Sequence, residues 1–340
     1  MPQIVQFFHP GGLPGNQNMR KDKNKRATAK NLLSEGDYPW NCGEHTRKFL
    51  KSLGVALDKN GNIVNGDFTF WGEWEANAKF FKTDAYPPYL FEAYISEEEM
   101  YDEILRQNTD PLVFGETWYY SNCKQPKLKT QLRKYGFDKL EYGSIIVFSS
   151  VKQKKTVIDT VFVVEKSEKY TSEIFQLGTI LHDVTLKNFE GDLEWLCKDH
   201  ILYSGKMFSK STLEPYSFVP AKKFDKLNNS VFNQPVLNLK ETFPELTWME
   251  NLGPNHGRNV YVSDVSEELA KKVWSHIKQA VLEADLLLGV EFDEPIRKKS
   301  ASTVRYNETK DAKTKLCGTA KSERIIDQPE SNRENRRPHC

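Results

Sequence analysis

Several familiar catalytic signatures are missing from the sequence, and each absence excludes a class of enzyme. The chain contains no Walker phosphate loop, no G-x-G-x-x-G segment that opens a helix after a strand, and no G-x-S-x-G nucleophile turn. These absences argue against the common NTPase, dehydrogenase and hydrolase plans. The sequence therefore indicates a fold class and a candidate site more directly than it indicates a reaction.

Metal-binding and membrane-spanning patterns are also missing. The cysteines show no C-x-x-C pair, and cysteines and histidines together show no spacing typical of zinc ligands, so we expect neither a metal site nor a cofactor. An odd number of unpaired cysteines is most simply interpreted as reduced thiols in a cytoplasmic protein. No apolar run approaches the length of a membrane span, and the N-terminus lacks the basic segment of a signal peptide, so we expect no contact with a membrane.

Charge of one sign does not dominate either. Lys and Arg number 48 against 47 Asp and Glu, which gives a net charge of +1. A surface that binds polyanions over its whole extent is therefore not implied, and only a local basic patch could bind nucleic acid. What the chain does have is aromatic residues, at 12%, a share that favours β-structure.

Hydrophobic periodicity predicts strands and short helices without a regular βαβ alternation. The predicted strands lie at 4–8, 68–81, 89–95 and 111–120, and a hairpin is predicted at 142–166. The predicted helices lie at 42–53, 96–107, 126–135 and 264–288.

This arrangement favours an α+β fold: a curved, mostly antiparallel sheet or a partly open barrel, flanked by helices. We expect a single α+β domain over residues 1–296, with a sub-boundary near 190–235. The composition of residues 297–340 predicts a disordered polar tail.

The segment FTFWGEWE carries the first candidate site, formed by Trp71, Glu73 and Glu75. In a strand these three side chains share one face, with the two carboxylates about 7 Å apart. Two such carboxylates repel each other, which can raise the pKa of one and give an acid beside a base. An indole beside them suits a flat, hydrogen-bonding ligand such as a nucleobase. The alternative is a solvated outer face that pairs with lysines of a neighbouring strand.

Two further candidates lie nearer the N-terminus. The segment FFHPGG places His9 on a rigid turn, where its imidazole could act as a base or anchor a ligand; the alternative is an ordinary turn. The segment NCGEHTRKF would begin a helix at Cys42, with His45 nearby and with Arg47 and Lys48 adding positive charge. Such a helix start suits a bound phosphate, or a thiol nucleophile with its base.

The segment TWYYSNCKQ mixes aromatic, amide and basic groups in Tyr119, Tyr120, Asn122 and Lys124. These groups could hold a splayed base by stacking and by hydrogen bonds to its edge; the alternative is a strand end that packs its tyrosines on the core. Asp159 lies inside an apolar predicted strand. Because a buried charge is costly unless paired, we expect a partner arginine or a ligand there, or else an exposed sheet edge.

Two resemblances to known families accompany these residues. The segments LEYGSIIVFSS and TVIDTVFVVEK resemble the barrel hairpin of the PUA-like superfamily, which includes the ASCH and EVE groups, and this implies a PUA-like barrel. The segments FFHPGG, FWGEWE, TDPLVFGE, YSNCKQ and VIDTVFVV resemble bacterial nucleotide-modification-associated domain proteins. The second resemblance implies a setting in DNA base modification or phage defence, with the matching residues His9, Trp71, Glu73, Glu75, Asn122 and Cys123.

Three functions stay open at this point. The first is recognition of a nucleotide or modified nucleobase, in which aromatic residues stack, Glu73 and Asn122 bind the base edge, and His9 and the basic residues meet phosphate. The second is an enzyme, a transferase or hydrolase acting on a nucleotide or nucleic acid, with Glu73 or Glu75 and His9 as the acid-base pair. The third is a structural or interaction protein whose aromatic segments are core. The sequence does not predict the oligomeric state.

Overall fold

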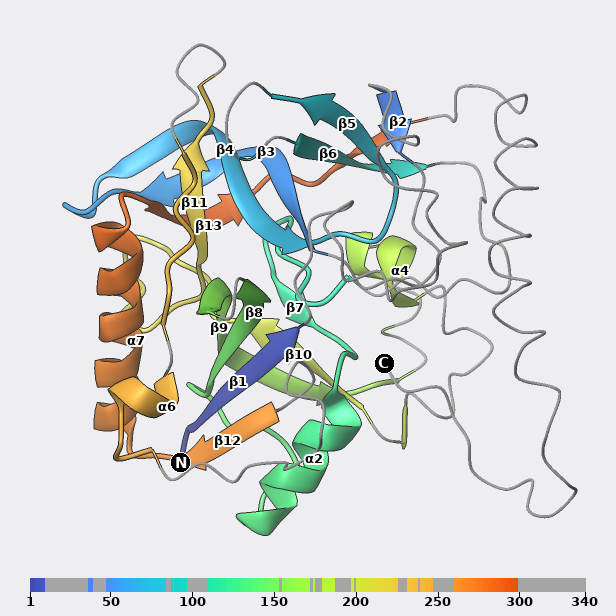
Figure 1. Ribbon diagram of the computed structural model, residues 1–340. Helices are drawn as coiled ribbons and strands as arrows, with labels where there is room; N and C mark the ends of the chain where they lie inside the picture. The colour runs from blue at the N-terminus through green and yellow to red at the C-terminus, as the bar shows by residue number, and fades with distance from the viewer. Residues whose placement is uncertain are drawn as a thin grey trace, which may run out of the picture.

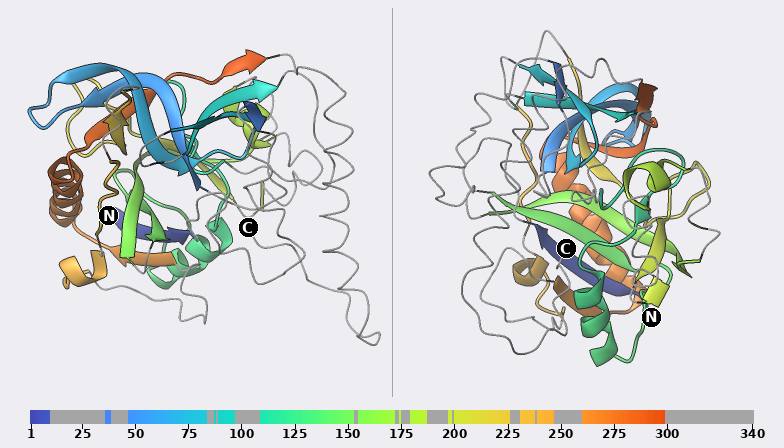
Figure 2. Two further views of the ribbon diagram at one scale, coloured as in Figure 1. Left: turned by 45° about the horizontal axis from the view of Figure 1, so that its top comes forward. Right: turned by 90° about the vertical axis from the view of Figure 1, so that its right-hand side faces the viewer.

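Two β-sheets make up most of the computed structural model, with the larger sheet above the smaller one in Figure 1 and Figure 2. The structure describes residues 1–9, 36–38, 47–83, 87, 89–96, 109–152, 155–171, 174, 179–186, 197–198, 200–225, 231–237, 239–246 and 260–298. The longest helix in this part of the chain, α7 (Glu267–Glu283), runs along one side of the sheets. The predicted α+β class is confirmed.

The smaller sheet has six strands in the order β12-β1-β8-β9-β10-β7. Their bounds are β1 Gln3–His9, β7 Tyr119–Tyr120, β8 Ile145–Lys152, β9 Lys155–Lys169, β10 Ile201–Gly205 and β12 Val260–Asp264. Strand β1 runs parallel to β8, and the other neighbours are antiparallel. The predicted hairpin is confirmed as β8 and β9, in which Lys152 pairs with Lys155 across the turn.

The larger sheet has eight strands, seven of them in the order β13-β11-β4-β3-β6-β5-β2, with β14 beside β6. Their bounds are β2 Gly36–Tyr38, β3 Arg47–Leu57, β4 Ile63–Glu73, β5 Ala78–Lys82, β6 Tyr89–Ser96, β11 Val219–Lys223, β13 Leu287–Phe292 and β14 Ile296–Lys298. Strand β13 pairs with both β11 and β3, so the path β3-β4-β11-β13 returns to β3. The strands thus form two mixed sheets instead of the single curved sheet predicted, and the PUA-like barrel stays a prediction.

Strand β3 occupies the place of the helix predicted at 42–53, so that prediction is wrong over residues 47–53, and 42–46 lie outside the described residues. Leu53, near the end of that segment, is 54% exposed. Gly54, which follows it, is a strand residue that β13 approaches closely. A Cβ added at Gly54 would lie 2.1 Å from the carbonyl oxygen of Glu291, so only glycine allows the two backbones to pair there.

Two predicted strands are also corrected. The segment 68–81 is not one strand, because β4 ends at Glu73 and β5 begins at Ala78. The segment 111–120 is mostly irregular, and only β7 at its end joins the smaller sheet. By contrast, the predicted strands at 4–8 and 89–95 are confirmed as β1 and β6.

The predicted helix at 126–135 is confirmed as α2 (Gln125–Lys134), with a proline in its first turn and Gly136 after its end at a φ of +84°. The prediction at 264–288 is confirmed as α7, capped by the Ser266 side chain, but it overruns because Leu287 already belongs to β13. The predicted helix at 96–107 begins at Ser96, which the structure places at the end of β6, and residues 97–107 lie outside the described residues. Short helices α4 (Ile180–Val184) and α6 (Leu239–Thr242) complete the described elements used here.

Hydrophobic contacts tie the two sheets together. One buried cluster combines Val5 and Phe7 of β1 with Phe68 and Phe70 of β4. A second cluster packs Trp274 of α7 and its neighbours against both sheets. The domain limits 1–296 stay a prediction, and the predicted tail begins inside β14, with residues 299–340 outside the described part. No helix that the structure describes is long and apolar enough to cross a membrane.

Candidate functional site

The end of β4 places Trp71 and Glu73 in the interior of the protein. Trp71 is 4% exposed and Glu73 is 1% exposed, so the alternative of a solvated outer face is wrong. Glu75 is also buried, but it lies beyond the end of β4, so the strand does not hold it on one face with Glu73. Its backbone N–H donates to Oγ1 of Thr109 at 3.1 Å. The predicted strand face is therefore realised for Trp71 and Glu73 only.

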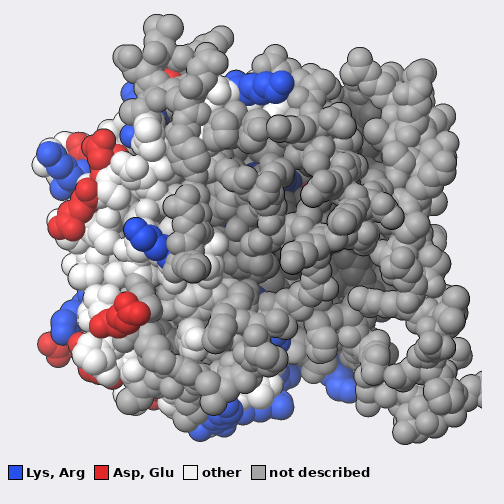
Figure 3. Space-filling view, in the orientation of Figure 1, with Lys and Arg blue, Asp and Glu red and all other residues white. Residues whose placement is uncertain are grey.

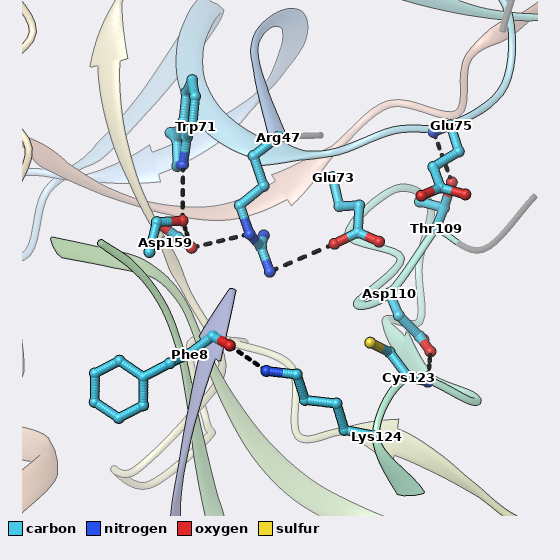
Figure 4. Close-up of polar contacts among 11 residues, drawn as sticks. Phe8, Arg47, Trp71, Glu73, Glu75, Thr109, Asp110, Cys123, Lys124 and Asp159 are labelled. Atoms are coloured by element: carbon cyan, nitrogen blue, oxygen red, sulfur yellow. Dashed lines mark hydrogen bonds and ion pairs between the residues drawn. The ribbon is translucent and has the colours of Figure 1, made fainter. Parts of the chain in front are cut away.

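Arg47 joins the two sheets by ion pairs. The register of β3 and β4 sets Arg47 opposite Glu73, and its Nη2 lies 3.6 Å from Oε2 of that residue. Its Nε lies 3.0 Å from Oδ2 of Asp159, on β9 of the smaller sheet. The arginine partner expected for Asp159 is thus present, and Figure 4 shows the guanidinium between the two carboxylates.

Ser150 extends this contact to the indole of Trp71. The Ser150 hydroxyl donates to Oδ2 of Asp159 at 2.6 Å and accepts from Nε1 of Trp71 at 3.3 Å. We call Trp71, Ser150, Asp159, Arg47 and Glu73 the inter-sheet network. All five side chains are buried, so these polar groups are oriented by one another and by the two sheets.

Lys124 reaches the same region from α2. It is the N-cap residue of that helix with a left-handed φ of 61°, and its amine donates to the carbonyl oxygen of Phe8 on β1. Burial lowers the pKa of Lys124 to about 8, while the nearby Cys123 and Glu73 act in the opposite direction. Figure 4 shows the Lys124 amine and the Cys123 thiol directed toward the Arg47–Glu73 pair.

Asp110 fixes the loop that carries Cys123 and Lys124. Its carboxylate accepts hydrogen bonds from the backbone N–H groups of Ser121, Asn122 and Cys123 at 2.7, 2.7 and 2.5 Å. Burial raises the pKa of Asp110 to about 6, although these hydrogen bonds lower it. Asp110 was not among the residues predicted from the sequence. A signal was present: an acidic residue precedes a proline and an apolar run, and the short polar run SNC follows about ten residues later.

Lys48 lies on the other face of β3 from Arg47, and the charges of Glu75 and Glu73 both act on its amine. Its amine donates to the carbonyl oxygen of Trp74 at 2.6 Å, and burial lowers its pKa to about 8. The predicted phosphate role of Arg47 and Lys48 at a helix start is wrong in its geometry, because both are strand residues whose side chains point to opposite faces.

The predicted stacking residues are occupied by core contacts. Trp71 packs edge-on against Phe49 with ring centroids 4.7 Å apart. Tyr120 is fully buried, stacks on Tyr203 at 5.5 Å, and donates its hydroxyl to the carbonyl oxygen of Cys123. Tyr119 is half-buried, and burial raises the pKa of its hydroxyl. Of the three aromatic residues predicted to stack on a base, Tyr119 therefore has the most exposed side chain.

The backbone of His9 lies beside the inter-sheet network. His9 is the last residue of β1 and pairs with Ser150, while its side chain lies outside what the structure describes. Asn122 is buried on the Asp110 loop. Residues from β1, β3, β4, β9 and the start of α2 thus converge, although they are far apart in the sequence.

The chemistry available here is hydrogen bonding with balanced charge. Arg47 and Lys124 supply donors and two positive charges, and Glu73 and Asp159 supply acceptors and two negative charges. Within the described residues, no group of three or more His, Cys, Asp and Glu side chains is placed to hold a metal ion. No family model, curated protein or solved structure matches the chain, so the functional argument depends on this geometry.

Proposed function

We propose that this protein recognises a nucleotide or a modified nucleobase, and that the base edge binds beside Arg47, Glu73 and Lys124. The observation that supports this proposal most is the burial and hydrogen bonding of Arg47. Its side chain is 1% exposed and is held at Nε by Asp159, yet its Nη1 makes no hydrogen bond with any residue that the structure describes. A buried donor without an acceptor is costly, so a ligand that supplies one gains that free energy.

The balance of charge favours a neutral, polar group over a phosphate at this point. Two cations already face two carboxylates, so a phosphate would add an unbalanced buried negative charge. A nucleobase edge presents donors and acceptors side by side without a net charge. Arg47 and Lys124 can donate to its carbonyl or ring nitrogen atoms, while Glu73 can accept from an amino group.

The aromatic contacts require one revision of the predicted roles. Because Trp71 and Tyr120 are packed in the core, we assign them to support of the fold around the site, and we assign no stacking role to Tyr119, whose charged neighbours Glu168 and Lys166 lie near the other end of β9 from Asp159. The setting in DNA base modification or phage defence is supported by the sequence resemblance alone. The polar groups that resemblance names, Glu73 and Asn122, lie on the two segments that meet here.

A matched pair of buried lysines tests the proposal. Lys124→Met removes a donor from the site, whereas Lys48→Met removes an equally buried amine from the opposite face of β3. We expect Lys124→Met to weaken binding of nucleosides or mononucleotides in calorimetric titrations by about tenfold or more, the value of a hydrogen bond from a charged group. Lys48→Met should bind like the natural protein. Equal binding by all three proteins would refute the site assignment.

The enzyme hypothesis keeps one specific observation in its favour. The backbone of His9 pairs with Ser150, so the end of β1 that carries this histidine adjoins the buried network to which Glu73 belongs. If they act as an acid-base pair on a nucleotide, Glu73→Gln should abolish turnover while nucleotide binding persists. In the purely structural alternative, Lys124→Met changes unfolding temperature and no binding.

A further inference from the structure

Helix α2 carries basic side chains on both flanks of its exposed side. Its buried residues are Gln125, Leu128, Gln131 and Leu132. Its charged residues are all cations, Lys127, Lys129, Arg133 and Lys134. At about 100° per residue these cations flank the exposed side of the helix, with Pro126 and Thr130 between them. No acidic side chain of the helix offsets this charge.

Neighbouring segments extend the basic face. The amine of Lys129 donates to the carbonyl oxygen of Lys198 at 3.4 Å, so Lys198 lies beside the helix. Lys139 follows the helix and is exposed. Asp138 pairs with Arg133 at 3.6 Å, but both side chains are more than half exposed, so solvent screens that pair. Figure 3 shows Lys and Arg along the lower edge of the molecule, where α2 lies in Figure 1.

The same helix begins at the candidate site. Lys124, its N-cap residue, lies in the interior beside Phe8 and the inter-sheet network, and the cations follow directly along the helix. Lys127 and Lys134 are separated by about 10.5 Å along the axis, which matches the axial rise of about three nucleotides of a strand. One element thus connects the proposed base site with a series of basic side chains.

We infer that the basic face of α2 binds the phosphate backbone of single-stranded nucleic acid, so that the ligand is a polynucleotide and not a free nucleotide. This inference rests on the proposed function, because it takes the base to enter the inter-sheet network. A base in that buried position cannot stay paired in a duplex.

The exposed side of α2 also argues against an anionic membrane as the partner. A helix that lies on a membrane needs large apolar side chains next to its cations. Between the cations of α2 stand only Pro126 and Thr130, and its leucines are buried in the core. The face therefore offers charge without an apolar surface to insert.

Two double variants with the same change in net charge test the inference. Lys129→Gln/Arg133→Gln removes two cations from α2, and glutamine keeps helix propensity. Lys271→Gln/Lys272→Gln removes two exposed cations from α7 as the control. Binding of a labelled oligodeoxythymidine is measured by anisotropy across a range of salt, together with thymidine monophosphate and with vesicles containing phosphatidylserine.

We expect the α2 variant to lower the slope of log K against log salt by about 1.4, which is about 0.7 for each lost phosphate contact of a single strand. Between 50 and 200 mM salt the affinity ratio to the natural protein should then change about sevenfold. Its affinity for thymidine monophosphate should be unchanged. The control should retain the natural slope.

The outcomes separate this inference from the proposed function. An α2 variant whose slope equals that of the α7 control overturns the inference, even where Lys124→Met still impairs mononucleotide binding. A lowered slope with an unaffected Lys124→Met variant supports the basic face and overturns the base site. Vesicle binding without oligonucleotide binding overturns the inference, and absence of all binding overturns both.

Discussion

Replacing Asp159 by asparagine tests the ion pairs on which the candidate site depends. The side chain is fully buried, 3.0 Å from Nε of Arg47, and asparagine keeps its shape while removing its charge. Beside Arg47, two cations, Arg47 and Lys124, then face the one carboxylate of Glu73. Breaking a buried pair from one side costs about 3–5 kcal/mol of unfolding free energy, because one charge is left uncompensated.

This loss converts to a shift that thermal unfolding can measure. An unfolding entropy of about 2.1 cal/mol/K per residue gives about 0.7 kcal/mol/K for 340 residues. A loss of about 3–5 kcal/mol therefore lowers the unfolding temperature by about 4–7 °C. The partly exposed pair of Lys51 with Asp67 provides the control, since Asp67→Asn should cost about 1 kcal/mol or less.

A double variant shows whether the loss of stability comes from the interaction of Arg47 with Asp159 or from each substitution separately. Arg47→Met/Asp159→Asn removes both charges and leaves Lys124 with Glu73, so balance returns. Its loss of stability should be smaller than the sum of the two single losses, with a coupling energy of about 1–3 kcal/mol. Additive losses, or an Asp159→Asn variant as stable as Asp67→Asn, would refute the network described above.

Two further predictions concern other parts of the molecule. Because the pKa of Asp110 rises from 3.8 to about 6 on folding, the native state keeps a proton that the unfolded chain releases, so stability should fall as pH rises from about 4 to 6. The Asp110→Asn variant, although less stable throughout, should lose that fall in urea denaturation series, and an unchanged profile would contradict the cause given. Gly54→Ala should reduce the free energy of unfolding by about 1–3 kcal/mol through overpacking, and so lower the urea midpoint, because the new methyl group meets the Glu291 carbonyl. Leu53→Ala at the exposed neighbouring position serves as its control, and equal midpoints for the two variants would show that β13 does not approach β3 as described.

Local signals explain which elements could be predicted. The hairpin of β8 and β9, the strand β1 and the helices α2 and α7 are marked by residues close in sequence, such as Pro126, Gly136 and Ser266. Strand β3 could not be predicted in this way. Its identity depends on β13, more than two hundred residues away, and on the absence of a side chain at Gly54.

The candidate site shows the same division. Arg47, Glu73, Lys124 and Asp159 each attracted attention for a separate local reason. The rule that a buried charge needs a partner gave an arginine as one of the alternatives for Asp159, and Arg47 is that partner. Their convergence follows from the way the two sheets meet, which no local pattern encodes. Asp110 was missed because its hydrogen bonds lead to a segment that is eleven to thirteen residues further on.

The path β3-β4-β11-β13 can close on β3 only after β13 has been synthesised. About 230 residues separate the end of β3 from the start of β13, which at about 5–20 residues per second is a wait of about 12–46 s on the ribosome. During that interval the early hairpin has an unpaired edge next to a strand rich in phenylalanine and tryptophan. Nascent chains of this protein are therefore expected to recruit chaperones until β13 emerges from the ribosome and pairs with β3.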